Sequence, residues 1–328
     1  MGLAVKEKGS VTSKKLWVYL SAFLVVAGFW ATLTIFFPKK TEEVKTPPLF
    51  PNLASDKIQE LQWQRGPEII HLKKKKGWEI IQPISVLADS GRVEGILQTL
   101  ISLKPERKFS EAIKNLKEFG LDYPKVKFLF LSQGKWSEIQ VGNKNVAGNA
   151  YYLKSSNSTD LFLIDEYLIK ELNQDLLTLR EKKVFSFTLD QVRGLEIRTN
   201  KKSFSMEKDA KGWISKDRPE KRLIKEKVDF FISDLLWLKA KGFAGQGSKD
   251  PKWGFKDLLY QVRLSSEGKD RREEVLILGA EIPQKGLCTM STLHKEVVFL
   301  DPSILKKIPQ GLEEWEDKTP PPAAKKGP

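Results

Sequence analysis

Residues 77–103 read GWEIIQPISVLADSGRVEGILQTLISL, and residues 212–238 read GWISKDRPEKRLIKEKVDFFISDLLWL. Both stretches begin with a Gly-Trp pair and continue into apolar residues at helical spacing. These residues are Val93, Ile96, Leu97, Leu100 and Leu103 in the first stretch, and Val228, Phe231, Ile232, Leu235 and Leu238 in the second. Such spacing predicts a helix whose apolar stripe covers one face of a sheet. An offset of about 135 residues relates the two stretches, which indicates an internal repeat.

The repeat extends well beyond these helices. Further matched sets are Ile58, Leu61 and Trp63 with Val192, Leu195 and Ile197; Gly120 with Gly254; Gly142 with Gly279; and Leu161, Phe162 and Leu163 with Val298, Phe299 and Leu300. Short alternating runs precede each helix, and the strand candidates 125–131, 137–141, 260–264 and 274–278 follow. Asp165 and Asp301 are each placed to cap a closing helix. We therefore predict an α+β fold with two tandem repeats of mainly antiparallel sheet with covering helices, over residues 55–185 and 186–316.

Residues 16–37 read LWVYLSAFLVVAGFWATLTIFF and contain no charged side chain. A helix of this length reaches about 33 Å, enough to cross a bilayer. Aromatic residues near both ends suit the membrane interfaces, and the predicted anchor residues are Leu16, Trp17, Tyr19, Trp30 and Phe37. A cleaved signal peptide would have a shorter apolar region and an A-x-A-like site. The sequence therefore predicts an uncleaved single-pass transmembrane helix.

Three segments outside the repeats complete the predicted organisation. Residues 1–15 form a short basic N-terminus, residues 38–54 a Pro-rich linker, and residues 317–328 a disordered tail rich in Pro and Lys. Lysines flank the apolar stretch on both sides, so the charge bias for orientation is small. The short basic N-terminus favours export of the residues that follow the helix.

The net charge of +14 indicates attraction to an acidic partner, such as anionic lipid, nucleic acid or an acidic protein face. Much of this charge flanks the apolar stretch or lies in the tail, which makes nucleic acid the least favoured partner. Lys73, Lys74, Lys75 and Lys76 lie on a predicted hairpin turn, either as a solvated turn or as a contact for lipid or partner. Trp78 and Trp213 occupy matched positions, so we interpret them as core anchors of the repeats.

No catalytic motif is present in the sequence. There is no GxxxxGK[ST], HExxH or GxSxG pattern, and one cysteine, Cys288, with two histidines, His71 and His294, offers little to a zinc or iron site. Paired carboxylates such as Glu273-Glu274 are adjacent and point to different faces of a strand. We therefore expect no cofactor, no metal and no enzymatic activity.

The run LLTLREKKVFSFTLDQVRGLEIRTNKKSFSMEKDAKGWI, residues 176–214, resembles the signature segment of the bacterial family called domain of unknown function 4340. The resemblance covers about residues 51–316 and includes the twofold repetition. It brings no catalytic residues. It implies a membrane-anchored bacterial protein, often encoded beside a gliding-motility-type ABC transporter. Together with the basic N-terminus, it leads us to expect a single-pass protein of the bacterial inner membrane, with its soluble region on the periplasmic or extracytoplasmic side.

These observations favour a membrane-anchored, non-enzymatic envelope protein that serves as an accessory or scaffold of an ABC-type transport system. The expected partners are the membrane and a transporter or auxiliary subunit. A binding module for an anionic envelope polymer or lipid surface is the first alternative, because of the basic turns and tail. An unrecognised hydrolase is the second, and it would need distant Asp, Glu or His residues to converge in a pocket.

Overall fold

The computed structural model describes residues 17–28, 46–110, 115–244, 250–256, 259–268 and 271–318. The chain divides into two units, residues 1–47 and 48–328. In the first unit, residues 17–28 form a helix. Across the described ranges, no helix has both the length and the apolar character that a membrane crossing needs. The predicted span also includes Leu16, Trp30 and Phe37, which lie outside the described residues.

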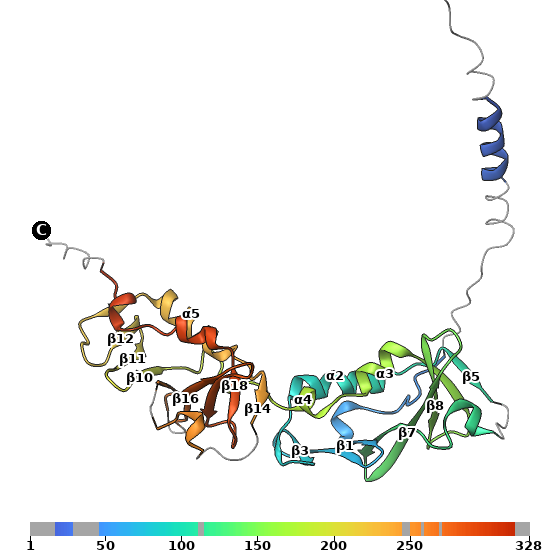
Figure 1. The fold of residues 1–328 in the computed structure, drawn as a ribbon, viewed down its shortest axis with the longest axis horizontal. Coiled ribbons are helices and arrows are strands. Elements are labelled where there is room, and N and C mark those ends of the chain that lie inside the picture. Colours follow the sequence, from blue (N-terminus) through green and yellow to red (C-terminus); the bar gives the residue numbers. More distant parts are fainter. Residues whose placement is uncertain are drawn as a thin grey trace, which may run out of the picture. The chain divides into compact units, whose positions relative to one another are not determined.

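The second unit contains two nine-stranded sheets, in which all paired strands run antiparallel (Figure 1). The strands of the first sheet are β1 (Ile58–Arg65), β2 (Glu68–Lys74), β3 (Trp78–Gln82), β4 (Val86–Leu87), β5 (Arg107–Phe109), β6 (Val126–Ser132), β7 (Lys135–Lys144), β8 (Ala150–Ser155) and β9 (Leu161–Asp165). Those of the second are β10 (Gly194–Arg198), β11 (Ser203–Asp209), β12 (Gly212–Ser215), β13 (Arg222–Leu223), β14 (Gly242–Phe243), β15 (Tyr260–Ser265), β16 (Glu273–Ile282), β17 (Gly286–Ser291) and β18 (Val298–Leu300).

The two sheets have the same topology. The first has the order β4-β3-β2-β1-β6-β7-β8-β9-β5, and the second has the order β13-β12-β11-β10-β15-β16-β17-β18-β14. Every strand in the second order is the counterpart of the strand at the same place in the first. We refer to the two copies as the first and second repeats. The predicted pair of α+β units with antiparallel sheets is therefore confirmed.

The helices repeat as well. They are α2 (Ser90–Ile101), α3 (Glu166–Leu172), α4 (Leu176–Leu179) and α5 (Lys225–Leu236), with the short 3-10 helices η1 (Ser55–Lys57), η2 (Leu116–Phe119), η3 (Pro251–Trp253), η4 (Pro302–Lys306) and η5 (Leu312–Glu314). Asp165 caps α3 by accepting a hydrogen bond from the Tyr167 N–H at 2.6 Å. Asp301 accepts from the Ser303 N–H at 2.9 Å, but the helix that follows it is the 3-10 helix η4.

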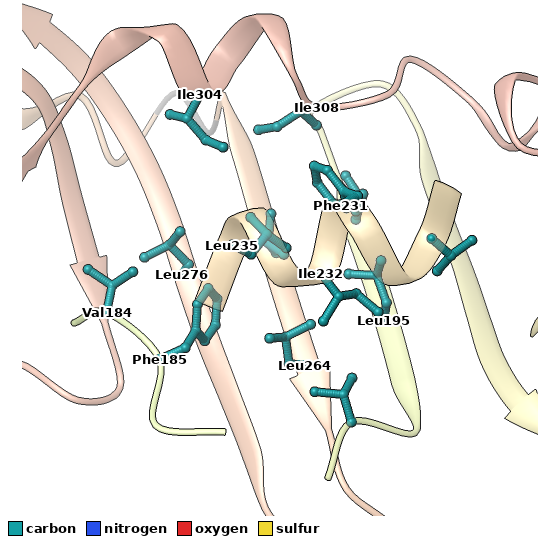
Figure 2. Close-up of a cluster of buried hydrophobic side chains, with 14 of the residues drawn as sticks. Val184, Phe185, Leu195, Phe231, Ile232, Leu235, Leu264, Leu276, Ile304 and Ile308 are labelled. Atoms are coloured by element: carbon teal, nitrogen blue, oxygen red, sulfur yellow. The ribbon is translucent and has the colours of Figure 1, made fainter. Parts of the chain in front are cut away.

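The inward faces of α2 and α5 supply much of each core. Val93, Ile96, Leu97 and Leu100 are buried on α2, and their counterparts Val228, Phe231, Ile232 and Leu235 are buried on α5. Figure 2 shows Phe231, Ile232 and Leu235 packed with Leu195, Leu264 and Leu276 from the strands of the second sheet. Leu103 and Leu238, the last residues of each predicted stripe, lie just beyond the helix ends. The predicted amphipathic helices are thus present, and each ends two residues before the last position of its apolar pattern.

A short segment carries the chain from the first repeat into the second. Asp89 donates its N–H to the Leu179 carbonyl at 2.9 Å, and Glu181 donates to the Leu87 carbonyl at 3.0 Å, so this segment first lines the β4 edge. Lys183 then forms a β-bridge with Lys239. Val184 and Phe185 are fully or almost fully buried in the second core. The core contacts therefore assign both residues to the second repeat.

Candidate functional site

The segment between the repeats brings a buried charged cluster together, which we call the junction. Arg180 lies next to α4, and its guanidinium donates a hydrogen bond to the Glu296 carboxylate from the turn between β17 and β18. Their side chains are only 10% and 9% exposed. The guanidinium also stacks on Phe243 of β14, with its central carbon 3.5 Å from the ring centroid. Burial lowers the pKa of Arg180, but the pairing with Glu296 favours the charged form.

His294 lies at the edge of the junction. Its Nε2 donates to the Lys183 carbonyl at 2.7 Å, because a carbonyl oxygen can only accept. The ring also contacts Phe243, with centroids 5.7 Å apart. Burial lowers the pKa of His294, and the positive charge of Arg180 adds to this effect. The imidazole is therefore neutral at pH 7, and its hydrogen bond holds the connecting segment.

A cavity of about 300 Å3 opens beside the junction. It is lined by Glu79 and residues 85–87 of the first repeat and by residues 292–296 of the second. Glu79 already pairs with Lys75 at 2.5 Å, and Glu296 pairs with Arg180. These carboxylates and His294 thus converge from distant parts of the chain, but each has a partner that fixes it in place.

The lysine hairpin, Lys73 to Lys76, lies where β2 turns into β3. All four side chains are exposed. Lys73 pairs with Glu60 at 2.9 Å and Lys75 with Glu79, whereas within the described ranges Lys74 and Lys76 make no ion pair. Burial would raise the pKa of Glu60, but hydrogen bonds from Lys73 and His71 outweigh it and lower this pKa. Ion pairs within the chain thus neutralise two of the four lysine charges of the hairpin.

The aromatic residues singled out in the sequence lie in contrasting environments. Trp17 and Tyr19 are 71% and 73% exposed on the N-terminal helix. Trp78 and Trp213 are 6% and 1% exposed, in the first and second cores. The indole N–H of Trp213 donates to Asp229 of α5 at 2.8 Å, which ties the sheet to its covering helix.

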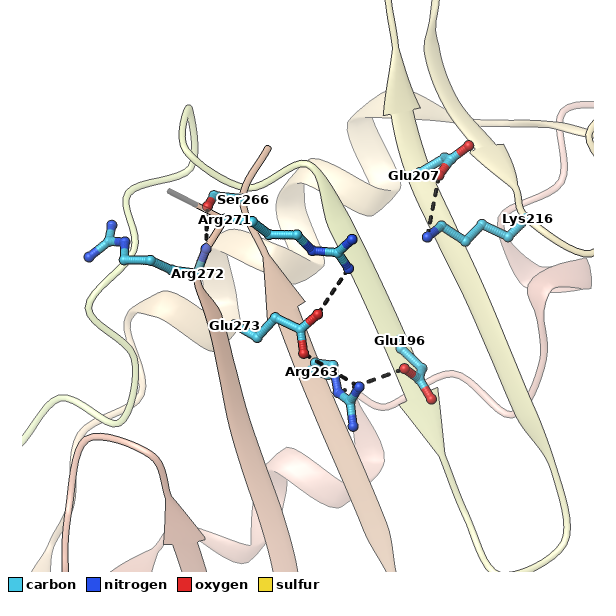
Figure 3. Close-up of polar contacts among 8 residues, drawn as sticks. All are labelled: Glu196, Glu207, Lys216, Arg263, Ser266, Arg271, Arg272 and Glu273. Carbon is cyan, nitrogen blue, oxygen red and sulfur yellow. Dashed lines mark hydrogen bonds and ion pairs between the residues drawn. The ribbon is translucent and has the colours of Figure 1, made fainter. Parts of the chain in front are cut away.

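The face of the second sheet opposite α5 carries a charge network. Figure 3 shows Arg263 between Glu196 and Glu273, with Arg271 also on Glu273. Glu196 points to this face because its neighbours Leu195 and Ile197 point into the core. Arg263 and Glu273 are 37% and 38% exposed, so these contacts contribute little stability.

A cavity of about 330 Å3 lies at the edge of the second sheet, near η5. Its polar lining is mixed in sign, with Lys202, Arg218 and Lys221 against Asp217, Glu313 and Glu316. Lys221 pairs with Glu316 at 2.7 Å across this cavity. Such a balanced lining favours no single class of charged ligand.

The described residues hold no group of three or more His, Cys, Asp or Glu side chains that could bind a metal ion. Cys288 is fully buried against Trp253, Val297 and Phe299. Burial raises the pKa of its thiol, so the thiolate that nucleophilic chemistry needs is disfavoured.

The chain is thus a duplicated α+β protein with two antiparallel sheets, and a buried ion pair joins the two copies. The family model described as "Domain of unknown function (DUF4340)" matches residues 78–257, which is more than half of the sequence. The chain belongs to this family, so the resemblance seen in the sequence is confirmed. No curated protein matches the chain, and no solved structure matches it.

Proposed function

We propose that the chain is a membrane-tethered, non-enzymatic module of the bacterial envelope that presents its two repeats to a protein partner. The observation that carries this proposal is the N-terminal helix. Trp17, Tyr19, Phe23 and Val25 are each 70–73% exposed, and other large apolar residues of this helix are 48% exposed or more. An apolar helix without cover of its own gains stability from a bilayer.

The repeats support a scaffold role. Both are built around extensive cores, and a buried ion pair joins them at the junction. By the association that the family resemblance implies, the proposed partner is an ABC-type transporter or its auxiliary membrane subunit. The proposed location is the inner membrane, with the repeats on the extracytoplasmic side.

Extraction of membranes from cells that make the full-length chain tests the tether. The chain should stay in the membrane pellet after alkaline carbonate, because only detergent can solvate the apolar helix. A variant with Leu20→Arg and Leu24→Arg should move to the supernatant, since charged side chains within a span are costly. Tyr123→Arg, at an exposed site of the first repeat, is the matched control and should stay in the pellet. A wild-type chain that remains soluble without detergent would refute the tether.

Purification in mild detergent tests the partner. A subunit of an ABC-type transport system should co-purify, and its recovery should hold when the salt concentration is raised, because apolar contacts are not screened. Repeated purifications that recover no such subunit would count against the proposed partner while leaving the tether intact.

The lysine hairpin favours a second candidate, a binding module for an anionic polymer or lipid surface. Lys74 and Lys76 are exposed and unpaired within the described residues, and each lysine near an anionic bilayer adds about 1 kcal/mol of attraction. Replacing both by Gln should then weaken binding to vesicles that contain phosphatidylglycerol, and added salt should have the same effect. Unchanged vesicle binding in this variant would remove the candidate.

The cavity beside the junction is the observation that keeps a hydrolase as the third candidate. His294, Glu79 and Glu296 reach it from distant parts of the chain. In this role His294→Gln would abolish turnover of ester or amide substrates. In the scaffold role it would change only stability, which makes the variant decisive between the two.

A further inference from the structure

The outer face of α5 carries two large aromatic side chains that none of the described residues covers. Phe230 is 70% exposed, and Trp237, the C-cap residue that follows the helix, is 72% exposed. They are seven residues apart, so they share one face and their Cα atoms lie about 10 Å apart along the axis. The shorter side chains of Ser233 and Asp234 lie between them. The result is a ridge with an aromatic ring at each end.

The fold does not require these rings. The opposite face of α5, with Phe231, Ile232 and Leu235, packs on the sheet (Figure 2). The first repeat provides the comparison, because α2 covers its sheet in the same way. At the two matched positions the first repeat has Gly95 and Ser102. The two copies therefore share their inner helix face and differ on the outer one.

The charges around the rings are balanced. Lys225 pairs with Asp229 at 3.0 Å, and Lys307 of the segment after η4 pairs with Asp234 at 2.7 Å. Lys227 donates to the Glu314 carbonyl at 3.0 Å. Among the described residues, Lys227 has only this carbonyl as a partner, but the three lysines are matched in number by the α5 carboxylates Glu226, Asp229 and Asp234. An anionic membrane or nucleic acid would be attracted by an excess of lysines. An apolar centre with a neutral polar rim is instead the usual composition of a protein interface.

We infer that α5 is a docking helix that inserts Phe230 and Trp237 into an apolar groove of a partner protein. Helices that bind grooves present anchors at such i and i+7 positions, and tryptophan is enriched among the residues that dominate binding energy. Two rings bury roughly 300–500 Å2, which is less than the ~800 Å2 per side of a stable interface. Two copies of the chain that bind each other through their convex α5 faces would therefore associate weakly. A groove on a partner protein would surround both rings and add contacts around them.

This inference rests on the proposal that the repeats face a protein partner, but it does not depend on the tether. A photo-crosslinking amino acid, placed at position 230 or 237 of the full chain in its native cells, tests it. The matched control positions are 95 and 102 on α2, where an added side chain has open space at Gly95. We expect one and the same protein, identified by mass spectrometry, to crosslink from both α5 positions and from neither α2 position.

Binding of that purified protein to the full chain completes the test. Phe230→Ser and Trp237→Ser should each weaken binding by about 30-fold, with no effect of salt and no change in unfolding midpoint. The control variant with Gly95→Phe and Ser102→Trp, which places the same two rings on the first repeat, should leave binding unchanged. Equal affinity for the wild type and both α5 variants overturns the inference.

Three other outcomes would also overturn it. Crosslinks between two copies, with a dimer that Trp237→Ser abolishes, would make α5 a self-association surface. Flotation with phosphatidylglycerol and phosphatidylethanolamine vesicles that depends on Trp237 would make it a lipid surface. If neither α5 position forms a crosslink, no protein binds this face of the helix. A failed tether is distinguishable, because the Leu20→Arg and Leu24→Arg chain can still be assayed for this binding in solution.

Discussion

Arg180 makes two contacts at the junction: its guanidinium pairs with Glu296 and stacks on Phe243. Arg180→Met leaves the Glu296 carboxylate buried without its partner, so we expect a loss of about 3–5 kcal/mol in the free energy of unfolding. Urea denaturation measures it. The double variant Arg180→Met, Glu296→Leu should recover most of the loss, since no buried charge then remains. Equal losses in the single and double variants would contradict the ion-pair explanation.

His294 should make stability depend on pH. Its pKa is lowered from 6.5, mainly by burial, so the folded protein binds a proton there less readily than the unfolded chain. This contribution to stability is therefore present above about pH 6.5 and is lost as the pH falls below that value. Unfolding midpoints at pH 7.5 and 5.5 measure it, and His294→Gln should show a smaller decrease than the wild type. The same decrease in both proteins would exclude His294 as its source.

Single residues differ in how far the sequence predicted them. The matched Gly-Trp pairs indicated buried tryptophans, because duplication favours a structural role. Arg180 and Glu296 are 116 positions apart and match no motif, so nothing in the sequence pairs them. Phe230 and Trp237 are marked in the sequence only by a difference between the two repeats. Comparison of the outer helix faces of the two repeats finds Gly95 and Ser102 at the same places.

At the scale of elements, a 3-10 helix packs against a glycine on the neighbouring strand in both repeats. A Cβ added at Gly279 of β16 would clash with the Trp253 carbonyl of η3, and one at Gly142 of β7 would clash with the Phe119 carbonyl of η2. Backbone atoms cannot move aside easily, so Gly279→Ala and Gly142→Ala should each cost about 1–3 kcal/mol. Thermal unfolding measures this effect.

Gly95→Ala is the control for these two variants. Nothing lies within 4 Å of an added Cβ at this position on α2. Alanine should therefore stabilise the protein by up to about 1 kcal/mol, through its higher helix propensity. If all three substitutions destabilised the protein equally, the close approach of the 3-10 helices would not be the cause.

Long elements were predicted well and short ones poorly. The apolar stripes predicted α2 and α5, and the alternation of apolar and polar residues predicted β6, β7, β15 and β16. Each of these patterns extends over several side chains. The edge strands β4, β5, β13 and β14 have only two or three residues, which is too few for a period. Their pairing depends on tertiary contacts. The predicted closing helix of the second repeat is a 3-10 helix that begins with Pro302.

At the scale of the whole molecule, the two repeats differ in the residues of their matched edge strands β4 and β13. The β4 edge reads Ser85, Val86 and Leu87, and these residues line the cavity beside the second repeat. The matched residues at the β13 edge are Glu220, Lys221 and Arg222. Charged side chains at a sheet edge disfavour pairing with a further strand.

A junction of this kind should make the repeats unfold together. Leu264 is fully buried in the second core, and Leu264→Ala should cost about 2–5 kcal/mol there. Because stability in repeat proteins includes an interface contribution, the first repeat should lose protection at the same time. Hydrogen exchange measured separately for α2 and α5 should show both helices weakened by Leu264→Ala. Adding Arg180→Ala, which removes the ion pair and the stacking on Phe243, should separate the two transitions. If α2 keeps its full protection in Leu264→Ala alone, the repeats are independent, and the buried pair serves orientation rather than cooperativity.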